Sequence, residues 1–176
     1  MTPRQKELVQ ISFEQLRSVP HTTAALFFGR LVDLDPDVLR LFPGEAEEQG
    51  RVLINVMGLA MKGLNRFEEL MGVLRDLGAR HAGYGVRESD YETVGAALIW
   101  TLEQSLGQAF TQEIRAAWIA VYQLFAGTLR AGAREALVVT AVGSSASTPR
   151  AKWHECSVLI TAAICVAIRP RRELRT

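Results

Sequence analysis

The sequence is poor in the residues that build most metal sites and disulfide frameworks. It contains two cysteines, Cys156 and Cys165, and three histidines, at positions 21, 81 and 154. One pair of cysteines nine residues apart does not make a disulfide framework. Three scattered histidines do not supply the ligand set of a bare zinc ion. A metal site with a single side-chain ligand is compatible with this composition only if a bound group supplies the other ligands.

The common catalytic motifs are also missing. The chain has no C-x-x-C, no H-E-x-x-H, no G-x-S-x-G and no glycine-rich phosphate-binding loop. These motifs carry the chemistry of thiol and zinc sites, serine hydrolases and nucleotide-binding enzymes. Their absence argues against all of these enzyme classes.

The sequence also lacks an excess of charge of either sign. Lys and Arg number 20 and Asp and Glu number 19, so the net charge is +1. No strong field is available to attract nucleic acid. The first ten residues, MTPRQKELVQ, lack the apolar core of a secretory signal. We therefore expect a cytoplasmic protein that binds no nucleic acid.

Helical periodicity dominates what is present, and strand patterns are almost absent. Thr2, Pro3 and Gln5 have the spacing of a capping box with proline at the first helical position, and Pro20 ends this helix. Seven or eight helices of unequal length predict an all-α fold that is not a simple up-and-down bundle. The other expected segments are residues 23–34, a short piece over 38–42 that stops at Pro43-Gly44, a helix from Glu45, 66–83, 91–106 and a last helix after Thr111.

The composition changes near the C-terminal end. The stretch 143–152, GSSASTPRAK, resembles a linker, and 156–168, CSVLITAAICVAI, is followed by RPRR. Thirteen apolar residues are fewer than the roughly 20 that span a bilayer as a helix, so we expect no firm membrane segment. We expect one domain over 1–135 and an extension over 136–176. The extension either packs on the domain, lies at a membrane surface, is disordered or comes from a shifted reading frame.

His81 lies in the stretch 77–86, LGARHAGYGV, at the expected end of a helix. A histidine there either meets the helix dipole and solvent or binds a ligand. A lone imidazole holds a metal well when a macrocycle supplies four nitrogens, because the protein then adds only an axial base and an apolar slot. Haem has this property.

The stretch LGARHAGYGV resembles the proximal segment of globins, with the pattern L-G-x-x-H-x-x-Y-G-V. The resemblance is to the bacterial single-domain, flavohaemoglobin-like and neuroglobin-like globins. It extends over roughly residues 4–133 and implies a globin fold of seven to eight helices around a haem pocket. Further segments resemble globin helices in the same order: LFF at 26–28, LF at 41–42, Q-x-x-x-L at 49–53, YETVG at 91–95 and AW at 117–118.

This resemblance implies a set of haem-binding residues. His81 resembles the axial ligand of haem b, and Phe42 the phenylalanine that packs on the haem plane. Gln49 takes the distal position, 32 residues before His81, where an amide N–H donates to dioxygen but an amide binds iron poorly. The ferrous iron is therefore expected to be five-coordinate. Phe28 stands where related globins often have a tyrosine, and it lines the pocket together with Leu53.

The proximal side is less defined. Leu77 and Val86 are expected to line it, although apolar residues there are equally consistent with plain core. Tyr91 resembles a tyrosine that, with a glutamate on the last helix, hydrogen-bonds the proximal histidine in flavohaemoglobins. Here the glutamate position is Ala133, and Glu135 points elsewhere on a helix. Tyr91 is therefore either a partner of His81 or a packed aromatic residue.

The function implied by the resemblance is reversible binding of dioxygen, and of CO and NO, in storage or transport rather than as an enzyme. One alternative is nitric oxide dioxygenase or nitrite reductase activity. That activity needs an external reductase, because no flavin or nicotinamide domain follows in this chain. A second alternative is a gas sensor or a haem-free interaction module.

Overall fold

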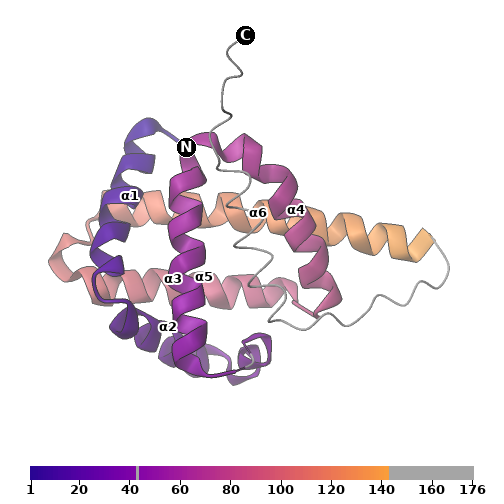
Figure 1. Cartoon of the computed structure of the whole chain (residues 1–176), viewed down its shortest axis with the longest axis horizontal. Coiled ribbons are helices and arrows are strands. Elements are labelled where there is room, and N and C mark those ends of the chain that lie inside the picture. The colour runs from indigo at the N-terminus through magenta and orange to yellow at the C-terminus, as the bar shows by residue number, and fades with distance from the viewer. Residues whose placement is uncertain (43, 143–176) are drawn as a thin grey trace, which may run out of the picture.

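Six α-helices and three short 3₁₀ helices form the part of the protein that a computed structural model describes, residues 1–42 and 44–142 (Figure 1). No strand occurs in these residues. The all-α prediction is confirmed, but with six α-helices instead of seven or eight, because the segment before Phe42 forms a 3₁₀ helix. The elements are α1 (Pro3–Arg17), α2 (Pro20–Leu34), η1 (Pro36–Leu41), α3 (Ala46–Gly63), η2 (Leu64–Arg66), α4 (Phe67–Gly83), α5 (Glu88–Leu106), η3 (Gly107–Ala109) and α6 (Gln112–Val142).

The helix starts follow capping residues that are visible in the sequence. The Thr2 hydroxyl accepts from the N–H of Gln5 at 3.2 Å, and the Gln5 side chain accepts from the N–H of Thr2 at 2.9 Å. Pro20 opens α2 three residues earlier than the periodicity predicts, because proline fits the first helical turn. The Asp35 carboxylate accepts from the N–H of Asp37 at 3.0 Å and opens η1. The predicted start of α1 is thus confirmed, whereas η1 begins at Pro36, two residues before the predicted segment 38–42.

The helices pack in two crossing groups. In Figure 1, α5 and α6 run side by side across the view, and α1, α3 and α4 cross them. Helix α4 packs extensively against α6, and α2 packs against both α3 and α5. One core cluster surrounds Trp118 and Phe13, each 1% exposed. The indole N–H of Trp118 donates to the hydroxyl of Ser12 at 2.9 Å, so this core also satisfies its polar atoms.

Two glycines allow the backbones of α4 and α6 to touch. A Cβ on Gly78 of α4 would lie 1.9 Å from the carbonyl oxygen of Leu129, and a Cβ on Gly132 of α6 would lie 2.0 Å from that of Arg75. Real Cβ atoms do not approach oxygen so closely, so only glycine fits at either position without movement of the helices. This crossing holds α4, which carries His81, against α6.

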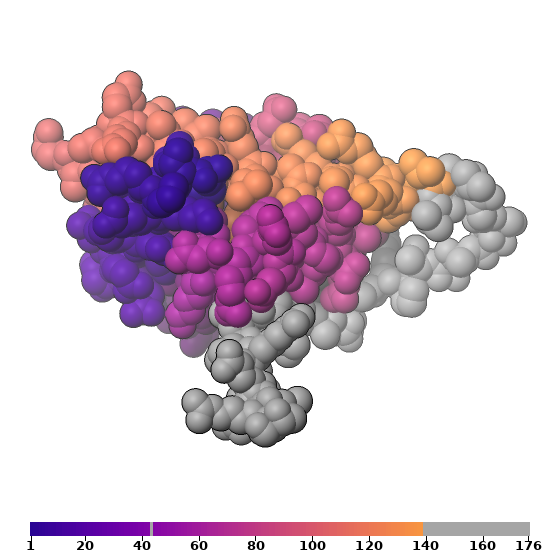
Figure 2. Space-filling model, turned by 90° about the horizontal axis from the view of Figure 1, so that it is seen from above, coloured from indigo at the N-terminus to yellow at the C-terminus, as the bar shows by residue number. Residues whose placement is uncertain are grey.

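Helix α6 continues to Val142 and projects past the other helices at its C-terminal end (Figures 1 and 2). The division of the chain at residue 135 stays a prediction. Residues 143–176, with the linker-like stretch and CSVLITAAICVAI, lie outside the described residues. None of the helices in the described part is long and apolar enough to cross a membrane.

Candidate functional site

Helix α4 ends at Gly83, two residues after His81, in a Schellman motif. The N–H of Val86 donates to the carbonyl oxygen of His81 at 3.0 Å, and the N–H of Gly85 donates to that of Ala82 at 3.1 Å. Gly85 has φ of +78°, a conformation that side chains rarely adopt. Gly85 therefore allows α4 to end and the chain to turn toward α5.

The imidazole of His81 lies next to the hydroxyl of Tyr91. Its Nδ1 is 3.2 Å from the Tyr91 Oη, and Tyr91 is only 7% exposed. Burial lowers the pKa of His81 to about 4 and raises the pKa of Tyr91 to about 12, so both groups are neutral at pH 7. When Nδ1 carries the proton and donates to Oη, the lone pair is on Nε2. This is the form of histidine that binds a metal.

The depressed pKa of His81 makes a prediction about the haem-free protein. Unfolded histidine takes up its proton near pH 6.5, whereas folded His81 resists protonation until about pH 4. The contribution of His81 to stability is therefore complete above pH 6.5. It should fall by about 3 kcal/mol between pH 6.5 and 4. Urea unfolding at several pH values in this range measures it.

The matched variant for this measurement is His81→Leu, which keeps an apolar group at the position. Other carboxylates also titrate at low pH, but they do so in both proteins. The difference between the two stability curves therefore isolates His81. Parallel curves between pH 6.5 and 4 would show that folded His81 takes up its proton as easily as an exposed histidine.

A cation, not a carboxylate, stacks on Tyr91. The guanidinium of Arg130, on α6, lies 5.2 Å from the centre of the Tyr91 ring and pairs with Glu88 at 3.1 Å. Glu135 instead pairs with Arg75, at 4.0 Å. The nearest charge of α6 to Tyr91 in this structure is thus positive, unlike the tyrosine–glutamate pair of flavohaemoglobins.

Four of the expected haem contacts lie in one apolar cluster. Phe28 on α2, Phe42 directly after η1, Leu53 on α3 and Val86 in the turn after α4 pack around a buried core that includes Phe27. The rings of Phe28 and Phe42 meet edge to face, with centroids 5.4 Å apart. All four are only partly buried. They form an apolar wall from segments far apart in the chain.

The remaining expected residues lie on the two helices that flank this region. Gln49 is partly buried on α3, one turn before Leu53 and therefore on the same side of the helix. Leu77 is 9% exposed on α4, one turn before His81. Val86 links the apolar cluster to the His81–Tyr91 pair, because it packs in the cluster and its N–H donates to His81. Gln49 lies near Leu53 of the cluster, and Leu77 lies near His81.

The chemistry of these residues fits haem. Within residues 1–42 and 44–142 no group of three or more His, Cys, Asp or Glu side chains can hold a bare metal ion. A single neutral imidazole, oriented through its Nδ1, suffices when a macrocycle supplies the four nitrogen ligands. The aromatic and aliphatic cluster suits the faces of a flat, apolar ring system.

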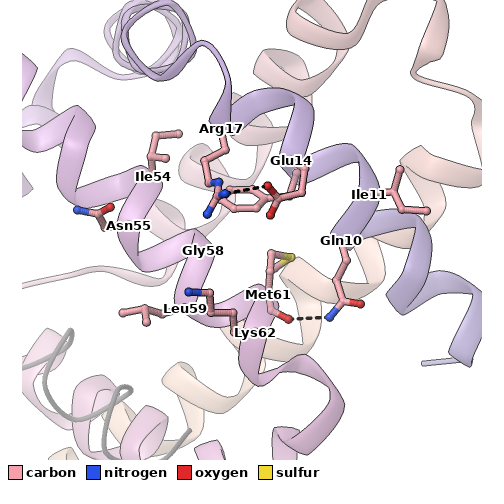
Figure 3. A pocket seen from close by; sticks show the side chains of 11 residues that line it. Gln10, Ile11, Glu14, Arg17, Ile54, Asn55, Gly58, Leu59, Met61 and Lys62 are labelled. Atoms are coloured by element: carbon pink, nitrogen blue, oxygen red, sulfur yellow. Dashed lines mark hydrogen bonds and ion pairs between the residues drawn. The ribbon is translucent and has the colours of Figure 1, made fainter. Parts of the chain in front are cut away.

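A surface groove between α1 and α3 contains none of the expected site residues (Figure 3). Its polar side chains are partly engaged with one another. The amide of Gln10 donates to the carbonyl oxygen of Met61 at 2.8 Å, and Arg17 pairs with Glu14 at 3.1 Å. This groove is separate from the candidate site.

Sequence reasoning missed a buried carboxylate beside the site. Asp90 is 1% exposed and accepts hydrogen bonds from Arg87 and Arg40. Burial raises the pKa of this carboxyl, but the two arginines outweigh burial and hold the pKa below its usual range. The spacing Arg87-x-x-Asp90 at a helix start was a readable signal. No sequence pattern indicated that Arg40, fifty residues earlier, also donates to Asp90.

Comparison with known proteins identifies the family. A family model described as Globin matches residues 25–129. The chain belongs to the globin family. This globin is 30% identical over 149 residues to neuroglobin of Tetraodon nigroviridis and 31% identical to neuroglobin of Chaenocephalus aceratus. Each alignment covers 75% of this chain and 92% of the relative.

A solved structure is similar in fold. It is the crystal structure of a hexacoordinated haem protein from an anhydrobiotic tardigrade at pH 4, with a TM-score of 0.67 and 21% identity. The match covers 76% of this globin and 96% of that chain. The globin resemblance and the all-α globin fold predicted from the sequence are confirmed, and membership of the family supports haem binding.

Proposed function

We propose that this globin holds haem b through His81 and reversibly binds dioxygen, with CO and NO as further ligands, in a storage or transport role in the cytoplasm. The haem-binding domain comprises residues 1–135, and 136–176 is an extension. One observation carries the proposal: the imidazole of a neutral, partly buried His81 lies 3.2 Å from the Tyr91 hydroxyl, beside a partly buried apolar cluster.

The residues on the two sides of the site have different proposed roles. When bound, haem would supply a ferrous iron that takes up a diatomic gas, and His81 would hold that iron. Tyr91 keeps the proton of His81 on Nδ1, so the lone pair of Nε2 would be available to hold the iron. Phe42 and Val86 exclude water. The amide N–H of Gln49 donates a hydrogen bond to the polar end of the gas, and Phe28 offers none.

Five-coordination of the ferrous form follows from the distal residues. A sixth ligand requires a second strong donor, and the Gln49 amide is a poor one. His21, the other histidine in the described residues, is exposed at the start of α2, 3.9 Å from Glu47. The tardigrade protein is hexacoordinated according to its name, so the coordination number is a discriminating measurement.

The surroundings of Tyr91 favour gas binding over oxygen activation. A carboxylate on the tyrosine would make His81 more basic and would suit nitric oxide dioxygenase activity. In this globin the guanidinium of Arg130 lies over the Tyr91 ring instead, where it lowers the pKa of Tyr91, while Glu88 and Asp90 each raise that pKa by less. Nitric oxide dioxygenase or nitrite reductase activity, with an external reductase, is therefore the second candidate.

An absorption spectrum of the purified full chain with added haem tests the proposal. The expected result is a Soret band, a five-coordinate spectrum after dithionite reduction and a new stable spectrum on exposure to air. A six-coordinate ferrous spectrum would overturn the coordination proposal alone. No haem uptake would overturn the proposed function and leave the haem-free interaction module.

The distal pocket makes a prediction about dioxygen dissociation. Gln49→Leu should raise the dissociation rate constant about tenfold, because it removes the amide donor, whose hydrogen bond contributes about 1–2 kcal/mol. Phe28→Tyr should lower the rate constant by a similar factor, because it adds a hydroxyl donor. Flash photolysis or stopped-flow mixing with dithionite measures both.

The control for this pair is Gln123→Leu, the same substitution at an exposed position of α6. Its dissociation rate constant should equal that of the wild type. If Gln49→Leu also left the rate constant unchanged, a different residue would stabilise the ligand.

A further inference from the structure

The carboxylate of Asp90 is buried at the start of α5, one residue before Tyr91. Its Oδ2 accepts from the backbone N–H of Arg87 at 2.8 Å, and its Oδ1 accepts from the Arg87 side chain at 3.1 and 2.9 Å. A further bond comes from the guanidinium of Arg40, at 2.5 Å. Four donors therefore converge on a side chain that is 1% exposed.

These contacts connect the two polypeptide segments that border the haem site. Arg40 belongs to η1, directly before Phe42, and also donates to the carbonyl oxygen of Gly85 at 3.4 Å, in the turn after α4. A second bridge joins the same segments, because Arg87 pairs with Asp35 at 3.4 Å. We call Arg40, Asp90, Arg87 and Asp35 the polar clamp.

The polar clamp does more than cap a helix. An N-terminal cap needs a local acceptor, and the bond from the Arg87 N–H to Asp90 already provides that. The bond from Arg40, fifty residues away, adds nothing to the cap. It ties η1, which directly precedes Phe42, to the turn that follows α4 and contains Val86, and both of these residues belong to the apolar cluster.

We propose that Asp90 is a positioning residue of the proximal haem site. Through Arg40 and Arg87 it holds η1 against the turn between α4 and α5, and it fixes the start of α5 so that the Tyr91 hydroxyl meets Nδ1 of His81. The polar clamp thereby sets the orientation of the His81 imidazole and the retention of haem. This inference rests on the proposed haem-binding function.

Two substitutions separate the parts of the clamp. Asp90→Asn keeps the shape but removes the charge, and its amide N–H₂ faces arginine donors. Arg40→Gln removes the bonds from Arg40 to Asp90 and Gly85, and it leaves the Arg87 donors on Asp90 and the Arg87–Asp35 pair in place. Glu103→Gln is the matched control, because Glu103 lies on the same helix and pairs with Arg115 at 3.1 Å on the surface.

The experiment uses the full-length haem-loaded proteins. Transfer of haem to an excess of a scavenging apoglobin gives the haem dissociation rate, and resonance Raman of the ferrous, ligand-free form gives the iron–histidine stretching band. Asp90→Asn should raise the haem dissociation rate at least about tenfold, and Arg40→Gln severalfold, as for other residues that orient a metal ligand. Both should shift or broaden the band. Glu103→Gln should change neither.

The outcomes are distinguishable. If the wild type takes up no haem, the proposed function fails and this inference fails with it. If the wild type binds haem and both clamp variants keep its band and dissociation rate, only the inference is overturned. Faster haem loss with an unshifted band and a parallel loss of thermal stability would mean a purely structural role, which also overturns it. If Asp90→Asn does not fold, the haem dissociation rate and the iron–histidine stretching band of Arg40→Gln decide whether the inference holds.

Discussion

Replacing His81 by alanine is expected to abolish stable haem binding, with a haem dissociation rate at least about a hundredfold above that of the wild type. The imidazole is the only axial base that the described part of the site provides, and its partner Tyr91 is a phenol that stays protonated because burial raises its pKa to about 12. Without His81 only apolar contacts would be left to hold the haem, and they are too weak to retain it. The ratio of haem to protein after gel filtration, together with the Soret band, measures the loss.

Two further samples make this result specific. His21→Ala removes an exposed histidine on α2 and should leave the haem content unchanged. Imidazole added to His81→Ala should occupy the vacated position and restore a histidine-like spectrum. An unchanged iron–histidine stretching band in His81→Ala would contradict the assignment of His81 as the ligand.

Replacing Gly78 by alanine is expected to lower the free energy of unfolding by about 3 kcal/mol. The new Cβ would lie 1.9 Å from the carbonyl oxygen of Leu129, and backbone cannot move aside as a side chain tip does. Helix α4 would have to shift away from α6, and His81, one turn later, would shift with it. Chemical denaturation measures the stability, and the haem dissociation rate should rise in the same variant.

The control lies on the same helix. A Cβ on Gly72 would meet nothing within 4 Å, so Gly72→Ala should leave the stability unchanged or raise it by up to about 1 kcal/mol, through helix propensity. Equal stability of the two variants would show that α4 and α6 do not approach each other this closely in solution.

The features of the site that depend on neighbouring residues could be predicted from the sequence. The capping box of Thr2 and Gln5 and the helix end after His81 are patterns of a few residues, and their hydrogen bonds form within one or two turns. The segment before Phe42 was predicted less well. Its Asp-Pro-Asp start was visible, but the 3₁₀ geometry was not, because six residues offer too little periodicity to distinguish the two helix types.

Contacts between distant segments could not be predicted in the same way. The sequence left open whether Tyr91 meets His81, because the answer depends on how α5 is turned relative to α4. The structure has these side chains 3.2 Å apart. Arg130 over the ring of Tyr91 comes from a third helix, and its position on α6 follows from the glycine contacts of that helix with α4.

The sequence by itself determined the helical class, most of the helix limits, the resemblance to globins and the identity of the candidate axial histidine. Each of these depends on the spacing of residues that are close in the sequence, because hydrogen bonds within a helix and its caps join residues at most five positions apart. Only the tertiary structure decided which side chains surround that histidine. Asp90 and Arg40 are fifty residues apart, and such pairs meet only once the helices have packed.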